Sequence, residues 1–393
     1  MYDALVVGAG PVGSYLAYRL GKLGYRVVVF ERRPRVGDAV CCTGIIGKEC
    51  FDRFPVANNA VLAQANSAKF FTPSGRYLRL SKETVQACIV DRVVFDRALA
   101  QKAQEAGAEY RVSSKVEDIV ISSDCAEAVV DCRGVRSDVK GRIALLSNGF
   151  GGSLSQKLGL GVISDFVLGT QAEVNVGKLD EVEVYFGQKV APGFFAWLVP
   201  TSQGKALAGL LSRRSPGLCL KNLLSTLLAQ GKIISAEDKI VYGVVPITPL
   251  PKTYKERVVV VGDAAGQVKP TTGGGIYYGL LCADIAAEVI HEALAADDLS
   301  ARRLSSYEKR WRKKLSKELQ VGYWARKLYE KLNDNQIERI FDIVHEDNIH
   351  ETLLRSPDFS FDWHSDSILR ALKDKPLSRA VRSVTMFSPP PRK

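Results

Sequence analysis

The sequence predicts an α/β fold in which a domain with a parallel sheet is joined to a domain with an antiparallel sheet and to a helical C-terminal region. A glycine-rich turn between a strand and a helix begins the chain, and a second such turn comes near residue 262. Short alternating strands broken by Gly, Pro and Ser lie between the two turns. A length of 393 residues is sufficient for about two or three domains.

The first glycine-rich turn has the form of a dinucleotide-binding site. Residues 2–7 read as a buried strand and residues 14–23 as a helix, with Gly8, Gly10 and Gly13 between them. In a Rossmann-type domain these glycines permit the tight turn, the approach of the backbone to a pyrophosphate, and the close packing of helix on strand. The other cofactor-facing residues expected in this turn are Pro11 and Val12. The alternative is a turn of the same composition that binds nothing.

A second apolar strand, residues 26–30, ends at Glu31 and is followed by Arg32. Glu31 lies at the interval expected for the acid that accepts hydrogen bonds from ribose hydroxyls, and we expect Arg32 beside the cofactor too. A carboxylate at this position would repel a 2′-phosphate. FAD and NAD, which carry free ribose hydroxyls, both fit here.

The second glycine-rich turn favours FAD. Residues 257–261 read as a strand that leads into Gly262 and Asp263, and Gly273, Gly274 and Gly275 precede a helix over residues 276–294. This return of the chain to a second strand-to-helix turn suggests that both ends complete one cofactor site. A Rossmann domain that binds only NAD does not need such a return.

The stretch from Gly262 to the triple glycine resembles the second FAD fingerprint of glutathione-reductase-like flavoproteins, in their hydroxylase and geranylgeranyl reductase branch. The resemblance implies that Asp263 binds the ribityl chain and that the glycines lie beside the flavin ring, where a helix N-terminus would stabilise negative charge. Arg92, in a motif that opens the next helix, matches the family's FAD-contacting arginine. The FAD contacts implied in this part of the chain are Arg92, Gly262, Asp263, Gly273, Gly274, Gly275 and Ile276.

Two further stretches are similar to geranylgeranyl reductases. The Cys41-Cys42 loop resembles a loop that approaches the flavin in relatives, which implies a catalytic role for Cys41 and a cofactor contact for Cys42; a small buried hydrophobe is the alternative. Phe195, Trp197 and Pro200 resemble the family's Tyr-x-Trp-x-Phe-Pro stretch, which implies an apolar wall for a prenyl chain. Ordinary core packing is the alternative for these aromatic residues.

The domain boundaries expected from these patterns make the nucleotide domain discontinuous. The expected segments are 1–68, 81–160 and 252–300 for the FAD-binding domain, 69–80 and 161–251 for the substrate domain, and 301–393 for the helical region. Within the last of these, residues 301–320 predict a basic amphipathic helix with one apolar stripe. Such a helix either packs on its own protein, lies on anionic lipid, or receives an acidic electron donor.

Composition sets further limits. The eight cysteines contain no Cys-x-x-Cys pair and only four histidines are present, so neither a metal site nor a disulfide framework is implied. No uninterrupted apolar run of about 18 residues occurs, so we expect a cytoplasmic protein, with peripheral membrane attachment left open. The formal charge of +11 suits an anionic membrane face or an acidic protein, and no nucleic-acid partner is expected.

The resemblance implies reduction of carbon–carbon double bonds in geranylgeranyl groups, of a lipid or a chlorophyll-type precursor, by hydride from reduced flavin N5. The electron donor would be NAD(P)H or reduced ferredoxin. A flavin-dependent monooxygenase or halogenase acting on a hydrophobic or aromatic substrate is the alternative, because these enzymes share both FAD motifs. Against a halogenase, Phe195 replaces the first Trp of the stretch that some halogenases carry, and no clear catalytic-lysine motif appears near residue 80, although Lys82 is present.

Overall fold

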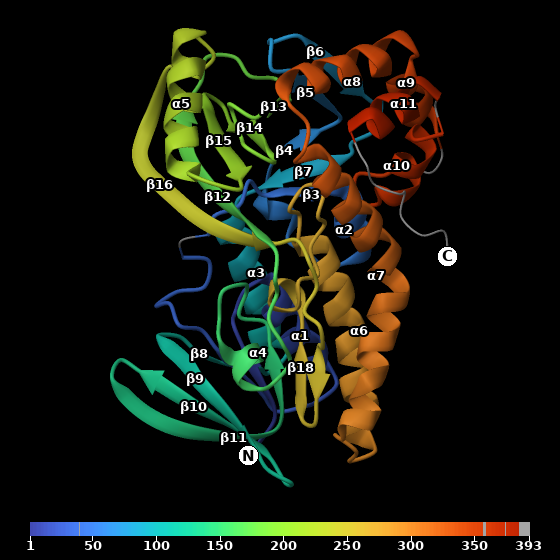
Figure 1. Cartoon of the computed structure of the whole chain (residues 1–393). Helices are drawn as coiled ribbons and strands as arrows, with labels where there is room; N and C mark the ends of the chain where they lie inside the picture. Colours follow the sequence, from blue (N-terminus) through green and yellow to red (C-terminus); the bar gives the residue numbers. More distant parts are fainter. Residues whose placement is uncertain (39, 357–358, 374, 385–393) are drawn as a thin grey trace.

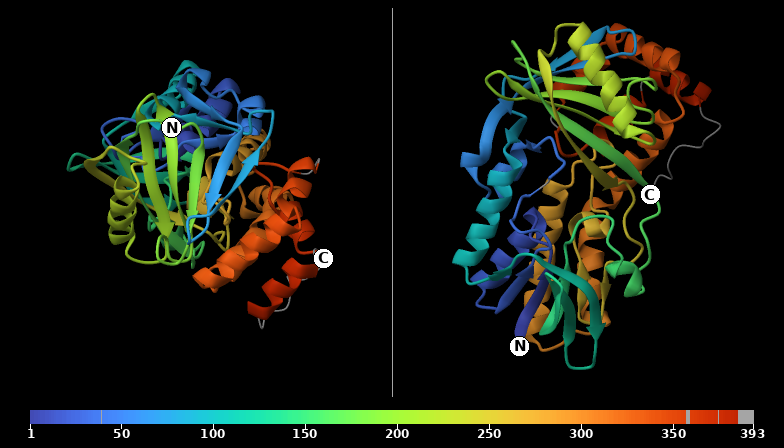
Figure 2. Two further views of the ribbon diagram at one scale, coloured as in Figure 1. Left: turned by 90° about the horizontal axis from the view of Figure 1, so that it is seen from above. Right: turned by 90° about the vertical axis from the view of Figure 1, so that its left-hand side faces the viewer.

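The computed structural model describes residues 1–38, 40–356, 359–373 and 375–384. Two sheet-based halves lie one above the other, with the N-terminal half at the bottom of Figure 1. Two long helices, α6 (Ile276–Ala295) and α7 (Ala301–Tyr329), run along one side of the lower half and reach the upper one. The right-hand view in Figure 2 shows the two halves as separate groups of strands, one above the other, joined through the middle of the molecule.

The lower half is built on a mainly parallel sheet. Its strands, in spatial order, are β17 (Tyr254–Lys255), β18 (Val258–Val260), β11 (Val135–Leu146), β1 (Tyr2–Val7), β2 (Val27–Phe30) and β8 (Glu109–Arg111). β11 continues into an antiparallel meander with β10 (Ala126–Cys132) and β9 (Ser114–Ile121). Along β1, Ala4 and Val6 pack into the helix-side core, while Leu5 and Val7 pack into the core on the meander side. This period of two shows that the sheet is covered on both faces.

Helices cover one face of this sheet. They are α1 (Pro11–Lys22), α3 (Arg92–Glu105) and α6, and α7 packs against α6. The apolar stripe of α7 is buried in the same core; its residues are Leu304, Tyr307, Trp311, Leu315 and Leu319. The stripe predicted for residues 301–320 therefore packs on its own protein, and the helix extends nine residues further, to Tyr329.

The upper half is a seven-stranded sheet. Its strands, in spatial order, are β16 (Ser235–Pro246), β12 (Phe166–Asn175), β15 (Lys205–Ser212), β14 (Phe195–Ser202), β13 (Val182–Phe186), β5 (Ser67–Phe71) and β6 (Tyr77–Ser81). One helix, α5 (Pro216–Ala229), packs on its outer face against β12 and β15. A small third sheet with two short helical turns joins the halves; it consists of β3 (Ile45–Gly47), β7 (Ala87–Val90), β4 (Val61–Ala65), α2 (Lys48–Arg53) and η1 (Asn58–Ala60).

The C-terminal helices lie beside the upper half, on the opposite side from β16 in Figure 1. They are α8 (Asp334–Glu346), α9 (Ile349–Arg355), α10 (Ser365–Ala371) and α11 (Lys375–Val384); residues 385–393 of the expected 301–393 region lie outside the described residues. The segment before α10 returns to the centre of the molecule, where the Tyr278 hydroxyl donates to the Asp362 carbonyl at 2.9 Å. None of the described helices combines the length and apolar character that crossing a bilayer requires.

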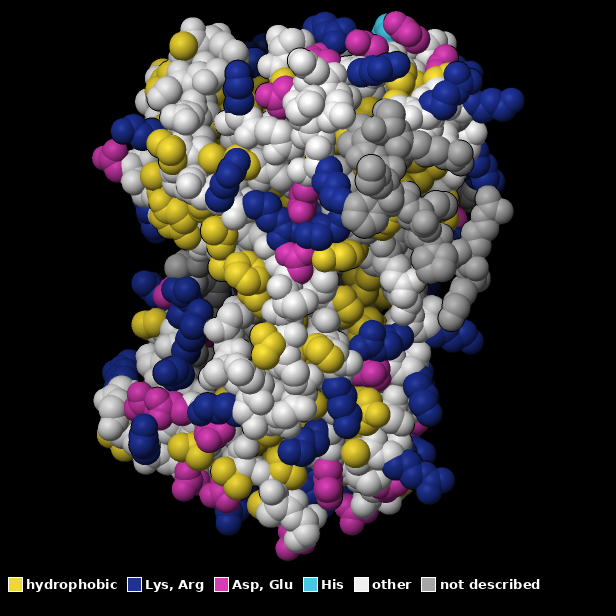
Figure 3. Space-filling view, in the orientation of Figure 1, with side chains coloured by type: hydrophobic (Ala, Val, Ile, Leu, Met, Phe, Trp, Pro, Cys, Tyr) yellow, Lys and Arg dark blue, Asp and Glu magenta, His cyan; other side chains and the backbone are white. Residues whose placement is uncertain are grey.

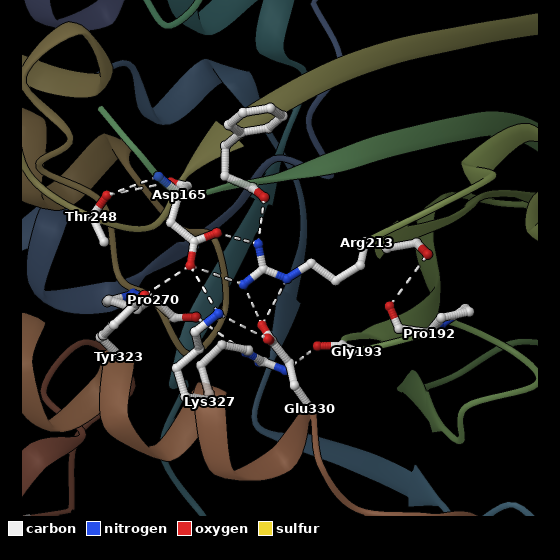
Figure 4. A network of polar contacts seen from close by, with 12 residues as sticks. Asp165, Pro192, Gly193, Arg213, Thr248, Pro270, Tyr323, Lys327 and Glu330 are labelled. Atoms are coloured by element: carbon white, nitrogen blue, oxygen red, sulfur yellow. Dashed lines mark hydrogen bonds and ion pairs between the residues drawn. The ribbon is translucent and has the colours of Figure 1, made fainter. Parts of the chain in front are cut away.

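A polar network joins the upper sheet to the end of α7 (Figure 4). Arg213, just after β15, forms ion pairs with Asp165 and with Glu330. Asp165 also accepts a hydrogen bond from the Tyr323 hydroxyl at 2.8 Å and lies 3.1 Å from the Lys327 Nζ. Because Asp165 precedes β12 and the other partners lie on α7 or follow it, the network holds the upper sheet against this helix.

Candidate functional site

A cavity of about 1210 Å³ lies between the two halves. The lower half lines it with the turn after β1, the end of β2, the Cys41 loop and the Gly273–Gly275 turn. The upper half lines it with one face of its sheet. This volume exceeds the range of roughly 300–1,000 Å³ usual for small-molecule sites. It is large enough for a dinucleotide and a second ligand together.

The turn after β1 forms a cradle for a pyrophosphate. Gly8 has φ +100°, and a Cβ there would lie 2.6 Å from the Ser147 carbonyl oxygen. A Cβ on Gly13 would lie 2.0 Å from the Gly8 carbonyl oxygen, so close packing of helix on strand requires glycine there. A Cβ on Gly10 would meet no atom within 4 Å, and Gly10 lines the cavity together with Pro11 and Val12. The helix N-terminus begins at this open space without a side-chain cap, as an anion site requires.

Glu31 is held at the end of β2 by two backbone donors. Ala9 N donates to Glu31 Oε2 at 3.1 Å, and Arg33 N donates to Oε1 at 2.9 Å. Glu31 and the neighbouring Arg32 both line the cavity next to the glycine turn. The carboxylate therefore stands where it can accept hydrogen bonds from ribose hydroxyls.

The second glycine-rich turn lines the same cavity as the first. Asp263 lines the cavity, and burial of its carboxylate raises its pKa while the positive charge of Arg92 opposes that rise. A Cβ on Gly275 would lie 2.4 Å from Asp263 Oδ1, so only glycine fits beside this carboxylate. Gly262, with φ +74°, packs on Val12 behind the wall. Gly273, Gly274 and Ile276 line the cavity.

Three residues of the cavity wall each carry a buried polar atom without a partner in the described part of the chain. The Asn148 Oδ1, Gln171 Oε1 and Trp197 Nε1 atoms are inaccessible to solvent and make no hydrogen bond among the described residues, and all three residues line the cavity. Buried polar groups without partners cost about 1–3 kcal/mol each, so these side chains would gain by turning toward a polar ligand. The desolvated Asp263 carboxylate and the open space at Gly10 fit a flavin dinucleotide.

The Cys41 loop lies against the edge of the upper sheet. Cys41 Sγ donates to the Val241 carbonyl at 3.8 Å, and a Cβ on Gly243 would lie 3.1 Å from the Cys41 Cβ. Burial, and to a smaller extent Cys42, raises the pKa of the Cys41 thiol to about 11. Both cysteines line the cavity, so the structure brings the loop to the site that the resemblance implied. At neutral pH Cys41 carries its proton.

Arg92 lies at the start of α3 and also lines the cavity. Its Nη2 donates to Asp96 Oδ1 at 3.0 Å, a pair four residues apart on the helix. The Asp91 side chain caps the helix by accepting from the Val93 and Val94 backbone N–H groups. The motif that opens α3 thus places the Arg92 guanidinium, held by Asp96, near both Cys42 and Asp263.

Aromatic and aliphatic side chains form the upper wall. Trp197 of β14 stands opposite Val184 of β13, which stands opposite Phe70 of β5. On its other side Trp197 stands opposite Gly209 of β15, which pairs with Gln171 of β12. Residues directly opposite each other share a face, so this row crosses the sheet toward the Cys41 loop. Phe195 and Phe186 form a second apolar pair on the same wall, with ring centroids 6.0 Å apart.

Three sequence-predicted residues do not belong to the cavity wall. Gly13 and Gly262 support it from behind, where a larger side chain would collide with neighbouring atoms. Pro200, three residues beyond Trp197 on β14, lies outside the described wall, so the expected substrate contact at Pro200 has no support in the geometry.

The sequence reasoning missed a buried ion pair on the wall. Lys269 Nζ lies 2.6 Å from Asp362 Oδ1, with side-chain exposures of 6% and 2%. Both residues and Phe361 line the cavity, and a Cβ on Gly274 would lie 2.8 Å from the Lys269 Cε. Lys269 lies between the two halves of the glycine motif, so its position in the sequence could have indicated that it lines the site. Asp362 stands more than 90 residues later and carries no local signal.

Comparison with known proteins shows the family to which the chain belongs. The family model described as lycopene cyclase protein matches residues 3–350. The digeranylgeranylglycerophospholipid reductase of Methanocaldococcus jannaschii is 31% identical over 88% of this chain and 91% of its own. The digeranylgeranylglycerophospholipid reductase 2 of Methanothermobacter thermautotrophicus is 31% identical and covers 98% of this chain and 99% of its own.

A geranylgeranyl bacteriochlorophyll reductase-like protein of Thermoplasma acidophilum has the same fold, with a TM-score of 0.85 at 24% identity, covering 98% of each chain. A halogenase solved in complex with FAD is similar at a TM-score of 0.67 and 13% identity, covering 98% of this chain and 94% of its own, so it shares the fold alone. FAD suits the cradle described above. The chain therefore belongs to the family that the lycopene cyclase model defines and, with these relatives, to the geranylgeranyl reductase family of FAD-dependent oxidoreductases.

Proposed function

We propose that this oxidoreductase reduces carbon–carbon double bonds in geranylgeranyl chains of a membrane glycerophospholipid. The observation that carries the proposal is the aromatic wall centred on Trp197, which faces the flavin cradle across one cavity. A prenyl chain has no group to hydrogen-bond, so an apolar wall is the surface that binds it. The relatives at 31% identity favour the glycerophospholipid over a chlorophyll-type precursor.

FAD held by the turn at Gly10, Glu31 and Asp263 would, when reduced, supply the hydride for one carbon of the double bond. The protein then has to supply a proton to the other carbon and keep water out. We assign proton delivery to Cys41 because it lines the cavity and a thiol carries its proton at neutral pH. The wall residues Phe70, Val184 and Trp197 would hold the chain and exclude water from the flavin side.

The decisive assay is anaerobic. FAD-loaded protein, reduced with dithionite, is mixed with detergent-dispersed digeranylgeranylglycerophospholipid, and the lipid is analysed by mass spectrometry. We expect a gain of two hydrogens for each double bond reduced. A lipid of unchanged mass in the presence of fully reduced, FAD-loaded protein would contradict the proposal. A geranylgeranylated chlorophyll precursor assayed in parallel tests the other prenyl substrate.

A monooxygenase or halogenase remains the second candidate, since such enzymes share this fold. Lys82 does not support a halogenase, because its Nζ lies over the Phe359 ring, 4.7 Å from the centroid, and it is not part of the described cavity wall. Oxygen consumption in step with substrate loss in air would favour this candidate. For the natural electron donor we propose NAD(P)H or a reduced ferredoxin, and the rates of flavin reduction by each will decide between them.

A further inference from the structure

An exposed apolar strip runs along the outer face of the upper sheet beside α5. Leu218 is 62% exposed and Tyr242 is 60% exposed, and the apolar side chains next to them are also exposed to solvent. The strip, called the docking face below, consists of Phe166, Leu218, Ile240, Tyr242 and Val244. Contiguous apolar surface of this kind on a folded domain marks an interaction site, whereas single exposed apolar residues do not.

The strand register places these residues together. On β16, Ile240, Tyr242 and Val244 stand opposite Ala172, Thr170 and Leu168 of β12, and Phe166 continues that row. Opposite residues share a face, so this row lies on the face that α5 covers in part. A Cβ on Gly217, at the start of α5, would lie 2.8 Å from the Tyr242 hydroxyl oxygen, which places Leu218 next to Tyr242.

β16 is also the edge strand of its sheet. Edge strands are normally shortened, charged or covered, because an exposed apolar edge invites association. β16 is twelve residues long, and its acidic residues, Glu237 and Asp238, lie at the end far from the lower half. The half of β16 nearest the cavity carries the apolar side chains and has no described acidic residue. In Figure 3 apolar atoms gather along the outer left side of the upper half, down to the hollow above the lower half.

The docking face continues into the cavity. Val244 belongs to both, and the Phe166 ring lies 5.5 Å from that of Phe150, which lines the cavity from the lower half. The docking face and the cavity therefore meet at apolar side chains, Val244 and the Phe166–Phe150 pair.

Basic residues flank the docking face. Arg214 and Lys221, on either side of Leu218, are exposed. On the lower side of the cavity, Lys115, Arg136 and Lys157 pair with Glu117 and Asp118, two acidic residues for three cations in the part of the chain that the structure describes. This arrangement of apolar side chains between cations matches the interface of a bilayer with anionic lipids.

The basic helix α7 suits this role less well. Its apolar stripe is buried, and five of its described cations pair with acidic residues. Those pairs are Arg303 with Glu292, Arg310 with Glu288 and Glu292, Arg312 with Glu308, Lys317 with Asp366, and Lys327 with Asp165 and Glu330. A surface that binds lipid needs exposed apolar side chains, and the apolar stripe of α7 is buried in the protein's own core.

We propose that the docking face binds the surface of an anionic bilayer and admits prenyl chains from it to the cavity. The admission of chains rests on the proposed function, whereas the binding of the bilayer does not. The occupant is a bilayer and not a second copy of this chain, because cations flank the face and the cavity opens beside it.

The test is co-sedimentation of the FAD-loaded protein with vesicles of phosphatidylglycerol and, separately, of phosphatidylcholine. We expect the wild type to sediment with phosphatidylglycerol vesicles and to be released by salt. The double variant Leu218→Glu/Tyr242→Glu should lose about tenfold in partition coefficient. The control Val135→Glu changes a side chain that is 70% exposed on the β10–β11 hairpin, and it should sediment like the wild type. Thermal melts of all three proteins establish that the variants fold.

Three results would overturn the docking proposal. They are a wild type that does not sediment, a double variant that sediments as well as the wild type, and equal loss in the Val135→Glu control. A wild-type dimer in analytical ultracentrifugation that the double variant dissociates would overturn it too, by assigning the face to a second copy. Failure of the proposed function would give a different result. Vesicle binding would still depend on the docking face, but no prenyl lipid would be reduced.

Discussion

The indole ring of Trp197 lies over Gly209, with Cε2 and Cζ2 each 2.7 Å from the position that a Cβ on residue 209 would occupy. The two residues stand opposite each other on β14 and β15. A side chain at position 209 would force the indole to move. The glycine therefore permits the observed position of the Trp197 ring.

Gly209→Ala should displace the Trp197 ring, and its Cβ would also lie 2.7 Å from the Thr170 carbonyl oxygen, so the neighbouring strand has to adjust. We expect KM for a prenyl substrate to rise by about tenfold, with FAD content unchanged. Michaelis kinetics and the flavin absorbance of the purified protein measure the two effects. Gly177→Ala is the control, because a Cβ there meets nothing within 4 Å. Equal loss of FAD and substrate affinity would show that Trp197 is only a core residue.

Asp263→Asn should weaken FAD binding by about 1.5–3 kcal/mol, because it replaces a charged acceptor by a neutral one. The apoprotein should unfold at the same or a higher temperature, since burial raises the pKa of Asp263 and the desolvated charge is removed. Fluorescence titration with FAD and melts of the apoprotein separate the two. Unchanged FAD affinity would mean that the carboxylate does not contact the cofactor.

Cys41 should react slowly with iodoacetamide at pH 8, and its rate should rise steadily toward pH 11, because its pKa is raised to about 11. Glutathione, an ordinary thiol, should approach its maximum rate at lower pH. Mass spectrometry of the peptide that contains residue 41 gives the rate at each pH. A rate that is already maximal at pH 8 would contradict the raised pKa and Cys41 as a protonated donor.

His364 should make the folded protein less stable as the pH falls from about 6.5 toward 4. Burial, and then the charge of Lys269, lowers its pKa to about 4, so the unfolded chain binds a proton that the folded one does not. Stability from this group is present above the unfolded pKa and is lost below it. Between pH 6.5 and 5 the loss should be roughly 1–2 kcal/mol larger in the wild type than in His364→Gln. Urea unfolding at the two pH values measures it, and equal losses would contradict the prediction.

Loss of one member of the Lys269–Asp362 pair should destabilise the fold strongly, whereas replacement of both members should destabilise it little. Asp362→Ala leaves a buried ammonium without its partner and should destabilise the fold by about 3–5 kcal/mol. The double variant Lys269→Met/Asp362→Ala should recover most of that loss. Urea unfolding measures both. A loss below about 1 kcal/mol in Asp362→Ala would mean that this part of the C-terminal segment is not docked.

Local patterns were enough to predict the nucleotide half. Glycine positions, strand and helix periods, and the acid at the end of β2 depend on contacts within a few residues, so the sequence alone predicted β1, β2 and the cradle. Helix ends were less exact: α1 begins at Pro11, because a proline suits the first helical position, and not at residue 14 as expected. The aromatic residues Phe195 and Trp197 were found by resemblance alone, and Pro200 did not belong with them on the wall.

By itself the sequence determined that both ends of the chain build one dinucleotide cradle, since each motif carries its own strand, turn and helix. Only the tertiary structure decided what faces that cradle. The Trp197–Gly209 pair depends on strand register, the Lys269–Asp362 pair joins distant segments, and the docking face appears only where α5 stops short of β16. Such contacts arise from packing between elements far apart in the chain, and no local periodicity specifies them.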